Sequence, residues 1–242
     1  ADRNVAIGVE ALTNMTAAST ADHYNVAVGY HAGKNVTSGQ QNTLIGGAAG
    51  DALTSGGNNV AIGYQALTTQ DVNGQNVAVG VQALRDQIVA GHGNNTAVGH
   101  QAGLLVTTGT QNTIIGGNAG DALTTGQRNT AVGYLALSTE DTHSYNTAIG
   151  TYSLLALNAG ADGYNTAVGY NTGQAMTTGT FNTIVGGLAG DALTTGGFNV
   201  AVGTGSLTSA TTSSRNVAIG RSALSTNILA SRNTAIGYQA LT

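Results

Sequence analysis

The sequence predicts an all-β fold, a parallel β-solenoid or β-roll of about fourteen rungs, each 17 to 21 residues long. Three observations lead to this fold class. A five-residue motif recurs through the whole chain, the motif has the two-residue alternation of a β-strand, and the segments between copies are polar and contain glycine. We therefore treat residues 1–242 as a single repetitive domain.

The motif reads Asn, then Val or Thr, then Ala, Leu or Ile, then Val or Ile, then Gly. Successive copies are 17 residues apart, apart from three longer intervals of 19 or 21 residues. The fourteen copies begin at Asn4, Asn25, Asn42, Asn59, Asn76, Asn95, Asn112, Asn129, Asn146, Asn165, Asn182, Asn199, Asn216 and Asn233. A pattern repeated this often predicts one structural unit per copy.

A second period of 70 residues lies over the first and defines super-repeats of four rungs at 25–94, 95–164 and 165–232. Four residues after the motif Gly, the first two rungs of a super-repeat carry Gly and the other two carry Leu. This pattern indicates that the long period is encoded in packing positions. Because the sequence starts three residues before one motif and stops inside another rung, we expect it to be a segment of a longer chain.

A 17-residue unit cannot bury its few aliphatic side chains alone, so the units must stack, with equivalent strands about 4.8 Å apart. Each rung is expected to contain a strand, a short second extended segment and a turn. Only turns can absorb insertions without breaking the stack. The length variation should therefore lie in residues 16–23, 86–93 and 156–163.

The invariant asparagine has two possible roles, and the sequence leaves both open. Stacked side-chain amides can hydrogen-bond along the axis as a ladder, or each Asn can cap a turn. The motif Gly indicates a tight turn or a close approach of the backbone. The predicted ladder comprises Asn25, Asn42, Asn59, Asn76, Asn95, Asn112, Asn129, Asn146, Asn165, Asn182, Asn199 and Asn216.

Four aromatic residues directly precede the motif Asn in consecutive rungs: Tyr145, Tyr164, Phe181 and Phe198. Stacking of the rungs predicts that these rings form a ladder. Mutual ring stacking that fixes the strand register is the interpretation we favour. The alternative is an exposed aromatic strip that stacks on the sugar rings of a surface glycan.

Composition and charge argue against several classes of function. Only 7% of residues are charged, and a net charge of -4 with seven Lys and Arg gives no basic surface for nucleic acid or anionic membranes. Cysteine is absent, which removes disulfides and thiolate metal sites, and no run of about 18 apolar residues predicts membrane insertion. We find no catalytic set and no cofactor motif, so we predict that the protein is not an enzyme.

Three aspartates, Asp51, Asp121 and Asp191, recur one super-repeat apart. A bound cation at each is conceivable, but calcium requires six to eight oxygen ligands, and these residues lie among Gly, Ala and Leu. We favour a role in turn formation. The five histidines do not occupy equivalent positions in the repeat, so we expect no metal site from them.

Copies such as Asn4-Val5-Ala6-Ile7-Gly8, Asn59-Val60-Ala61-Ile62-Gly63 and Asn146-Thr147-Ala148-Ile149-Gly150 resemble the head repeats of trimeric autotransporter adhesins, the YadA-like heads. They are similarly close to related repeats of phage tail fibres. The resemblance implies a left-handed parallel β-roll with three chains side by side, in an extracellular fibre on a cell surface or a virion. A cell-surface glycan or a host receptor is a candidate partner of such a fibre.

The alternation within the motif bears on assembly. Val or Thr and then Val or Ile project to one face of the strand, and the small residues project to the other. If the small face packs inward, an aliphatic stripe must meet another chain, and a homotrimer follows. In the opposite case a monomer is tolerable. The stripe would include Ile62, Val79, Val98, Ile115 and Val132.

The leading functional hypothesis is therefore a structural or adhesive fibre segment that supplies length, rigidity and presentation of a binding surface. One alternative is a glycan-binding adhesin that uses the aromatic ladder. Another is an ice-binding β-solenoid, suggested by low charge and by Thr at the second motif position in six consecutive rungs. Those residues are Thr96, Thr113, Thr130, Thr147, Thr166 and Thr183.

Overall fold

The computed structural model describes residues 3–16, 22–69, 72, 74–89, 91–226 and 228–242. These residues form fourteen three-residue strands and no helix, with one strand in each motif copy. Two compact units, residues 1–126 and 127–242, are described separately. Unit 1 contains β1 (Val5–Ile7), β2 (Val26–Val28), β3 (Thr43–Ile45), β4 (Val60–Ile62), β5 (Val77–Val79), β6 (Thr96–Val98) and β7 (Thr113–Ile115). Unit 2 contains β8 (Thr130–Val132), β9 (Thr147–Ile149), β10 (Thr166–Val168), β11 (Thr183–Val185), β12 (Val200–Val202), β13 (Val217–Ile219) and β14 (Thr234–Ile236).

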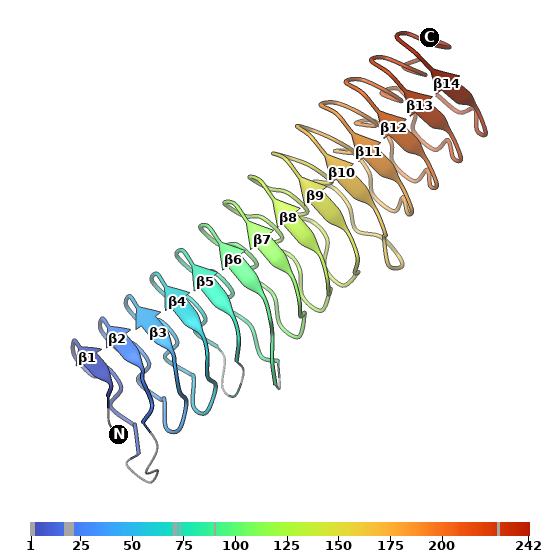
Figure 1. The fold of residues 1–242 in the computed structure, drawn as a ribbon. Helices are drawn as coiled ribbons and strands as arrows, with labels where there is room; N and C mark the ends of the chain where they lie inside the picture. Colours follow the sequence, from blue (N-terminus) through green and yellow to red (C-terminus); the bar gives the residue numbers. More distant parts are fainter. Residues whose placement is uncertain (1–2, 17–21, 70–71, 73, 90, 227) are drawn as a thin grey trace. The chain divides into compact units, whose positions relative to one another are not determined.

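Within each unit the strands follow one another in sequence order as a parallel stack, which Figure 1 shows as a row of aligned arrows. The register places each residue beside its equivalent in the next rung. Ile62 pairs with Val79 in unit 1, and Thr183 pairs with Val200 in unit 2. The predicted parallel β-solenoid with stacked repeat positions is confirmed.

The longer intervals leave this register unchanged. Val77 pairs with Thr96 across one 19-residue interval, and Thr147 pairs with Thr166 across the other. In the described part of residues 86–93 and in 156–163 there is no strand, so the extra residues lie in loops as predicted. For the first interval, 16–23, residues 17–21 lie outside the described residues.

The expected second extended segment is wrong. After the motif Gly the chain instead makes tight turns in which every second residue has a positive φ, for example 54° at both Gln65 and Leu67. The N–H groups of alternate residues point in opposite directions along the stack, and the Ala66 N–H between them donates to Gly63 within the rung. The Gln65 N–H donates to the Gly47 carbonyl of the preceding rung, and the Leu67 N–H donates to the Ala83 carbonyl of the next. The turns are thus hydrogen-bonded from rung to rung, as the strands are.

The core of each rung lies between the strand and these turns. The middle residue of each strand points inward, and Ala27, Leu44 and Ala61 are completely buried. Because this middle position carries Ala in most rungs, the interior is thin. The small face of the motif therefore packs inward.

The 70-residue period reflects an exchange of side-chain volume in the core. Where the strand contributes a large residue the turn contributes glycine, and where the strand contributes alanine the turn can contribute leucine. Where the strand contributes Leu44, the turn positions are Gly33 and Gly50, and a Cβ at either would lie 2.6 to 2.8 Å from a Leu44 methyl carbon. In the following rung the strand contributes Ala61, and the turn fills the space with the buried side chain of Leu67. Leu67 adopts the same positive φ as Gly50, so the two rungs share one backbone and exchange only side-chain volume.

The invariant asparagines form a continuous buried ladder in each unit. In unit 1 the backbone N–H and the Nδ2 of Asn42 donate to Oδ1 of Asn25 at 2.9 and 3.1 Å. The same Nδ2 also donates to the Gly56 carbonyl, in the turn that leads to the next motif copy. Each amide therefore connects three backbone segments, so the ladder prediction is confirmed and a turn carbonyl is satisfied as well.

Replacing one rung of the ladder should be costly. Asn182→Ala removes the acceptor of the Asn199 N–H and the donor to the Gly196 carbonyl, both of which are buried. Leaving two buried backbone groups unpaired should lower the free energy of unfolding by about 2 to 5 kcal/mol. Chemical denaturation followed by circular dichroism measures the loss.

The matched control is Asn158→Ala, because Asn158 has an exposed side chain in a loop. We expect this change to stay within about 0.5 kcal/mol of the unchanged chain. Equal losses for the two variants would show that the ladder does not stabilise the stack.

The exchange of side-chain volume can be tested by moving a large side chain from the strand to the turn of one rung. Leu44→Ala alone leaves a cavity and should cost about 2 to 5 kcal/mol, and Gly50→Leu alone overfills the core. The double variant reproduces the Ala61 and Leu67 arrangement of the next rung and should recover much of the lost stability. A double-mutant cycle with strictly additive losses would contradict volume exchange between strand and turn.

Candidate functional site

The second and fourth motif residues point outward and form the outer stripe of each unit. Their side chains are half-buried or exposed, and Ile45, Ile115 and Ile149 retain 37 to 38% of their surface. In unit 1 the outer stripe comprises Val5, Ile7, Val26, Val28, Thr43, Ile45, Val60, Ile62, Val77, Val79, Thr96, Val98, Thr113 and Ile115. In unit 2 it comprises Thr130, Val132, Thr147, Ile149, Thr166, Val168, Thr183, Val185, Val200, Val202, Val217, Ile219, Thr234 and Ile236.

No charged residue occurs in any of the fourteen strands, so the outer stripe is uniformly aliphatic or hydroxylated. One side of the stripe is bounded by the motif glycines. A Cβ on Gly46 would lie 2.6 Å from the Gly63 carbonyl oxygen of the next rung, and Gly46 has a φ of 133°. The predicted close backbone approach is therefore correct, and this edge of the stripe carries no side chain.

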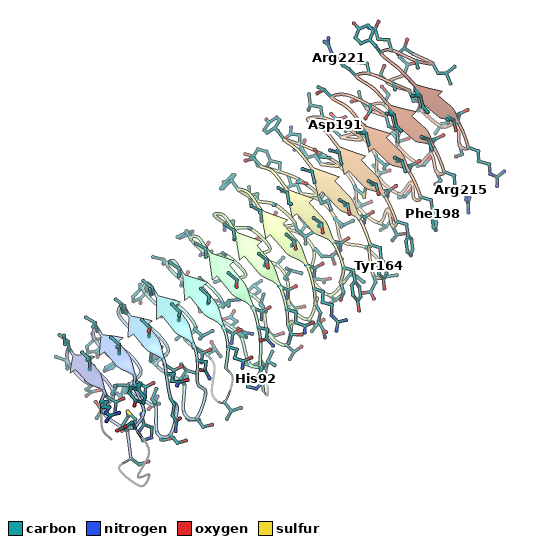
Figure 2. The ribbon with its side chains drawn as sticks, viewed as in Figure 1. His92, Tyr164, Asp191, Phe198, Arg215 and Arg221 are labelled. Atoms are coloured by element: carbon teal, nitrogen blue, oxygen red, sulfur yellow. The ribbon has the colours of Figure 1, made fainter. Side chains whose placement is uncertain are left out.

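The four aromatic residues before the motif Asn stack face to face in unit 2, as predicted. Ring centroids are 4.8 Å apart between Tyr145 and Tyr164, and 5.2 and 5.0 Å apart for the next two pairs. Neighbouring rings are within 7° of parallel. Figure 2 shows Tyr164, Phe198 and Arg215 in a row on one side of the strands, with Asp191 and Arg221 on the other.

Arginines cover the two ends of this aromatic ladder. The Arg128 guanidinium lies 5.5 Å from the Tyr145 ring centroid, and Arg215 lies 5.5 Å from that of Phe198. Because the faces of the rings are covered by one another and by these cations, mainly ring edges meet solvent. Stacking on a sugar requires a free ring face, so the arrangement favours the register-fixing interpretation.

A second ladder of side-chain amides, in the turns, was not predicted from the sequence. In unit 1 the Nε2 of Gln82 donates to Gln65, Gln101 donates to Gln82, and the Nδ2 of Asn118 donates to Gln101. Asn118 Nδ2 also donates to the Asp121 carboxylate at 3.2 Å. The signal was available, because these four amides all stand two residues after a motif Gly.

The three periodic aspartates are not brought together with other metal-ligating groups among the described residues. Asp121 accepts the Asn118 hydrogen bond, and Asp191 accepts one from the Thr208 hydroxyl at 3.0 Å. Partial burial raises the pKa of the Asp51 and Asp121 carboxyls. A structural role in the turns agrees with these contacts.

Together these features define a parallel β-solenoid repeat protein with one short strand per rung. No family model, curated protein or solved structure significantly matches this chain. The described residues contain no helix of the length and apolarity needed to cross a bilayer.

The aromatic ladder predicts an unusual order of stabilities at Phe181. This residue has a φ of 59°, which glycine adopts without strain and alanine only at an energetic cost. Phe181→Ala should cost about 1 to 3 kcal/mol, because two stacked pairs are lost while the backbone strain remains. Phe181→Gly should be less destabilising by about 1 kcal/mol. Thermal or chemical denaturation showing Ala more stable than Gly would contradict the assignment of strain.

Proposed function

We propose that this chain is a rigid structural segment of an extracellular or virion fibre, in which copies of the chain pack against one another through the outer stripe. The observation that carries the proposal is the outer stripe itself. In each unit it places Val, Ile and Thr side chains side by side from rung to rung, without a charged residue among them.

Such a surface is costly to leave in water. Contiguous exposed aliphatic surface on a soluble protein usually marks an interaction site. Burying it contributes roughly 25 cal/mol for each Å² removed from water. The fourteen strands carry no charged residue, so a partner approaching the stripe need not desolvate a strand charge.

The partner that fits best is another copy of the chain. The outer stripe has the same period as the rungs, so a second copy offers a surface of matching spacing, and closed symmetric assemblies are the usual form of self-association. We take the number of chains in the assembly to be three from the resemblance of the repeats to trimeric adhesin heads and phage fibres. Rung-to-rung hydrogen bonds through both strands and turns supply the rigidity that a fibre segment requires.

A second candidate function is ice binding by the outer stripe of a monomeric chain, in which no other copy covers the stripe. In unit 2, Thr147, Thr166 and Thr183 stand in consecutive rungs and point outward beside the aliphatic residues. A regular array of hydroxyl and methyl groups on a sheet suits ice binding. The two functions exclude each other, because a face covered by another copy cannot contact ice. A monomeric chain that shows thermal hysteresis would favour this candidate.

Assembly is measured by sedimentation equilibrium or light scattering of the chain at micromolar concentration. We expect three times the 23.9 kDa chain mass. Val98→Asp introduces a charge into the outer stripe, which should dissociate the assembly, because an unpaired buried charge is strongly disfavoured. Circular dichroism should remain that of a folded solenoid, since Val98 faces away from the core.

Ile88→Asp is the matched control, because Ile88 is an exposed aliphatic residue in a loop away from the strands. This variant should retain the mass of the unchanged chain. A monomeric unchanged chain would overturn the proposal, as would an assembly that tolerates Val98→Asp as well as Ile88→Asp.

A further inference from the structure

Glu140 occupies a position at which other rungs place a core aliphatic residue. The position lies seven residues after the motif Gly. Its side chain is half-buried at Met15 in the first rung and buried in the later rungs that the structure describes at this position. The set comprises Val36, Leu53, Gln87, Val106, Leu123, Glu140, Leu157, Met176, Leu193 and Ala210. The Glu140 side chain is completely buried, and a carboxylate in such a place requires compensation by a cation or by hydrogen bonds.

The groups around Glu140 are themselves ligands for a metal ion. His143 Nδ1 lies 2.7 Å from Glu140 Oε1, and one ligand atom each from Glu140, Asp141 and His143 fall within 4.8 Å of one another. In the described part of the chain this is the one such group. Among the described residues, the one hydrogen bond to Glu140 from outside the group is a long one, 3.4 Å, from the Ala159 N–H to Oε2.

We propose that Glu140, Asp141 and His143 bind a divalent transition-metal ion of the zinc type. Glu140 is completely buried, and carboxylate oxygens and an imidazole nitrogen are ligands that zinc uses in proteins. Zinc takes one nitrogen and two oxygen ligands at about 2.0 to 2.2 Å and completes its shell with water. Asp141 and His143 are partly exposed, so solvent can supply that water.

The mixed donor set also selects the class of ion. Calcium prefers six to eight oxygen ligands, and a histidine nitrogen is a poor substitute for one of them. Imidazole suits zinc and its neighbours. Coordination through Nδ1 requires that the imidazole hold its hydrogen on Nε2. Because protons compete with a metal ion for its ligands, binding should weaken at acidic pH.

The chain contains its own control for this site. One super-repeat later, Ala210, Thr211 and Ser213 stand where Glu140, Asp141 and His143 stand, and the residue between is Thr in both rungs. The backbones are equivalent, because the motif asparagine donates to the His143 carbonyl at 2.9 Å and to the Ser213 carbonyl at 3.0 Å. The rung therefore folds with or without the ligand set, and the inference is independent of the proposed fibre function.

The test is calorimetric titration of the whole chain with zinc chloride alone at pH 7.5. We expect one ion per chain, binding at least tenfold weaker at pH 5.5, and no comparable binding of calcium. The triple variant Glu140→Ala, Asp141→Thr, His143→Ser copies the later rung and should bind at least tenfold more weakly with an unchanged circular dichroism spectrum. His100→Ser changes a histidine outside the group and should bind as the unchanged chain does.

Three results would overturn the proposal. The first is the absence of saturable zinc binding below about 0.1 mM. The second is an affinity that the triple variant shares with the unchanged chain, and the third is binding that His100→Ser abolishes instead. If the triple variant loses its fold, Glu140→Gln takes its place, because this change keeps the side-chain volume and removes one ligand charge.

Discussion

The structure depends on one interaction, the buried hydrogen-bonded ladder of motif asparagines. Within each unit the Oδ1 of one motif asparagine accepts the backbone N–H of the next, as between Asn182 and Asn199. The Nδ2 of Asn182 donates to the Gly196 carbonyl, in the turn that leads to the next motif copy. No other side chain of this length carries a donor and an acceptor on one short amide. This explains why the position never varies in the sequence, whereas the loops between rungs change length.

The remaining features follow from stacking a short strand over such a ladder. The inward side of the strand meets a thin core whose volume is divided between strand and turn, as Leu44 with Gly50 and Ala61 with Leu67 show. The outward side cannot share that core and becomes the outer stripe. The buried Glu140 side chain is accompanied by His143, whose Nδ1 lies 2.7 Å from Glu140 Oε1.

The sequence was sufficient for the features that repeat in every rung. The strand positions, the parallel register and the aromatic stack all follow from placing equivalent residues above one another. For the motif asparagine the sequence left a ladder and a turn cap open, and the structure decided for the ladder. The turn backbone was not predicted, because Leu67 and Gln65 give no sign that they adopt a positive φ. The alternation alone did not decide which face of the strand is buried. The structure shows that the turns lie close to the strand and leave room mainly for the small residues. The group at Glu140 was missed because it occurs in a single rung.

The most direct test of this account is amide hydrogen exchange by nuclear magnetic resonance of the side-chain Nδ2 protons. In the ladder, Asn42 and Asn182 should exchange many times more slowly than the exposed Asn158, because their protons open to water only when rungs separate. Exchange of the ladder amides as fast as that of Asn158 would contradict the claim that buried asparagines hold the rungs together.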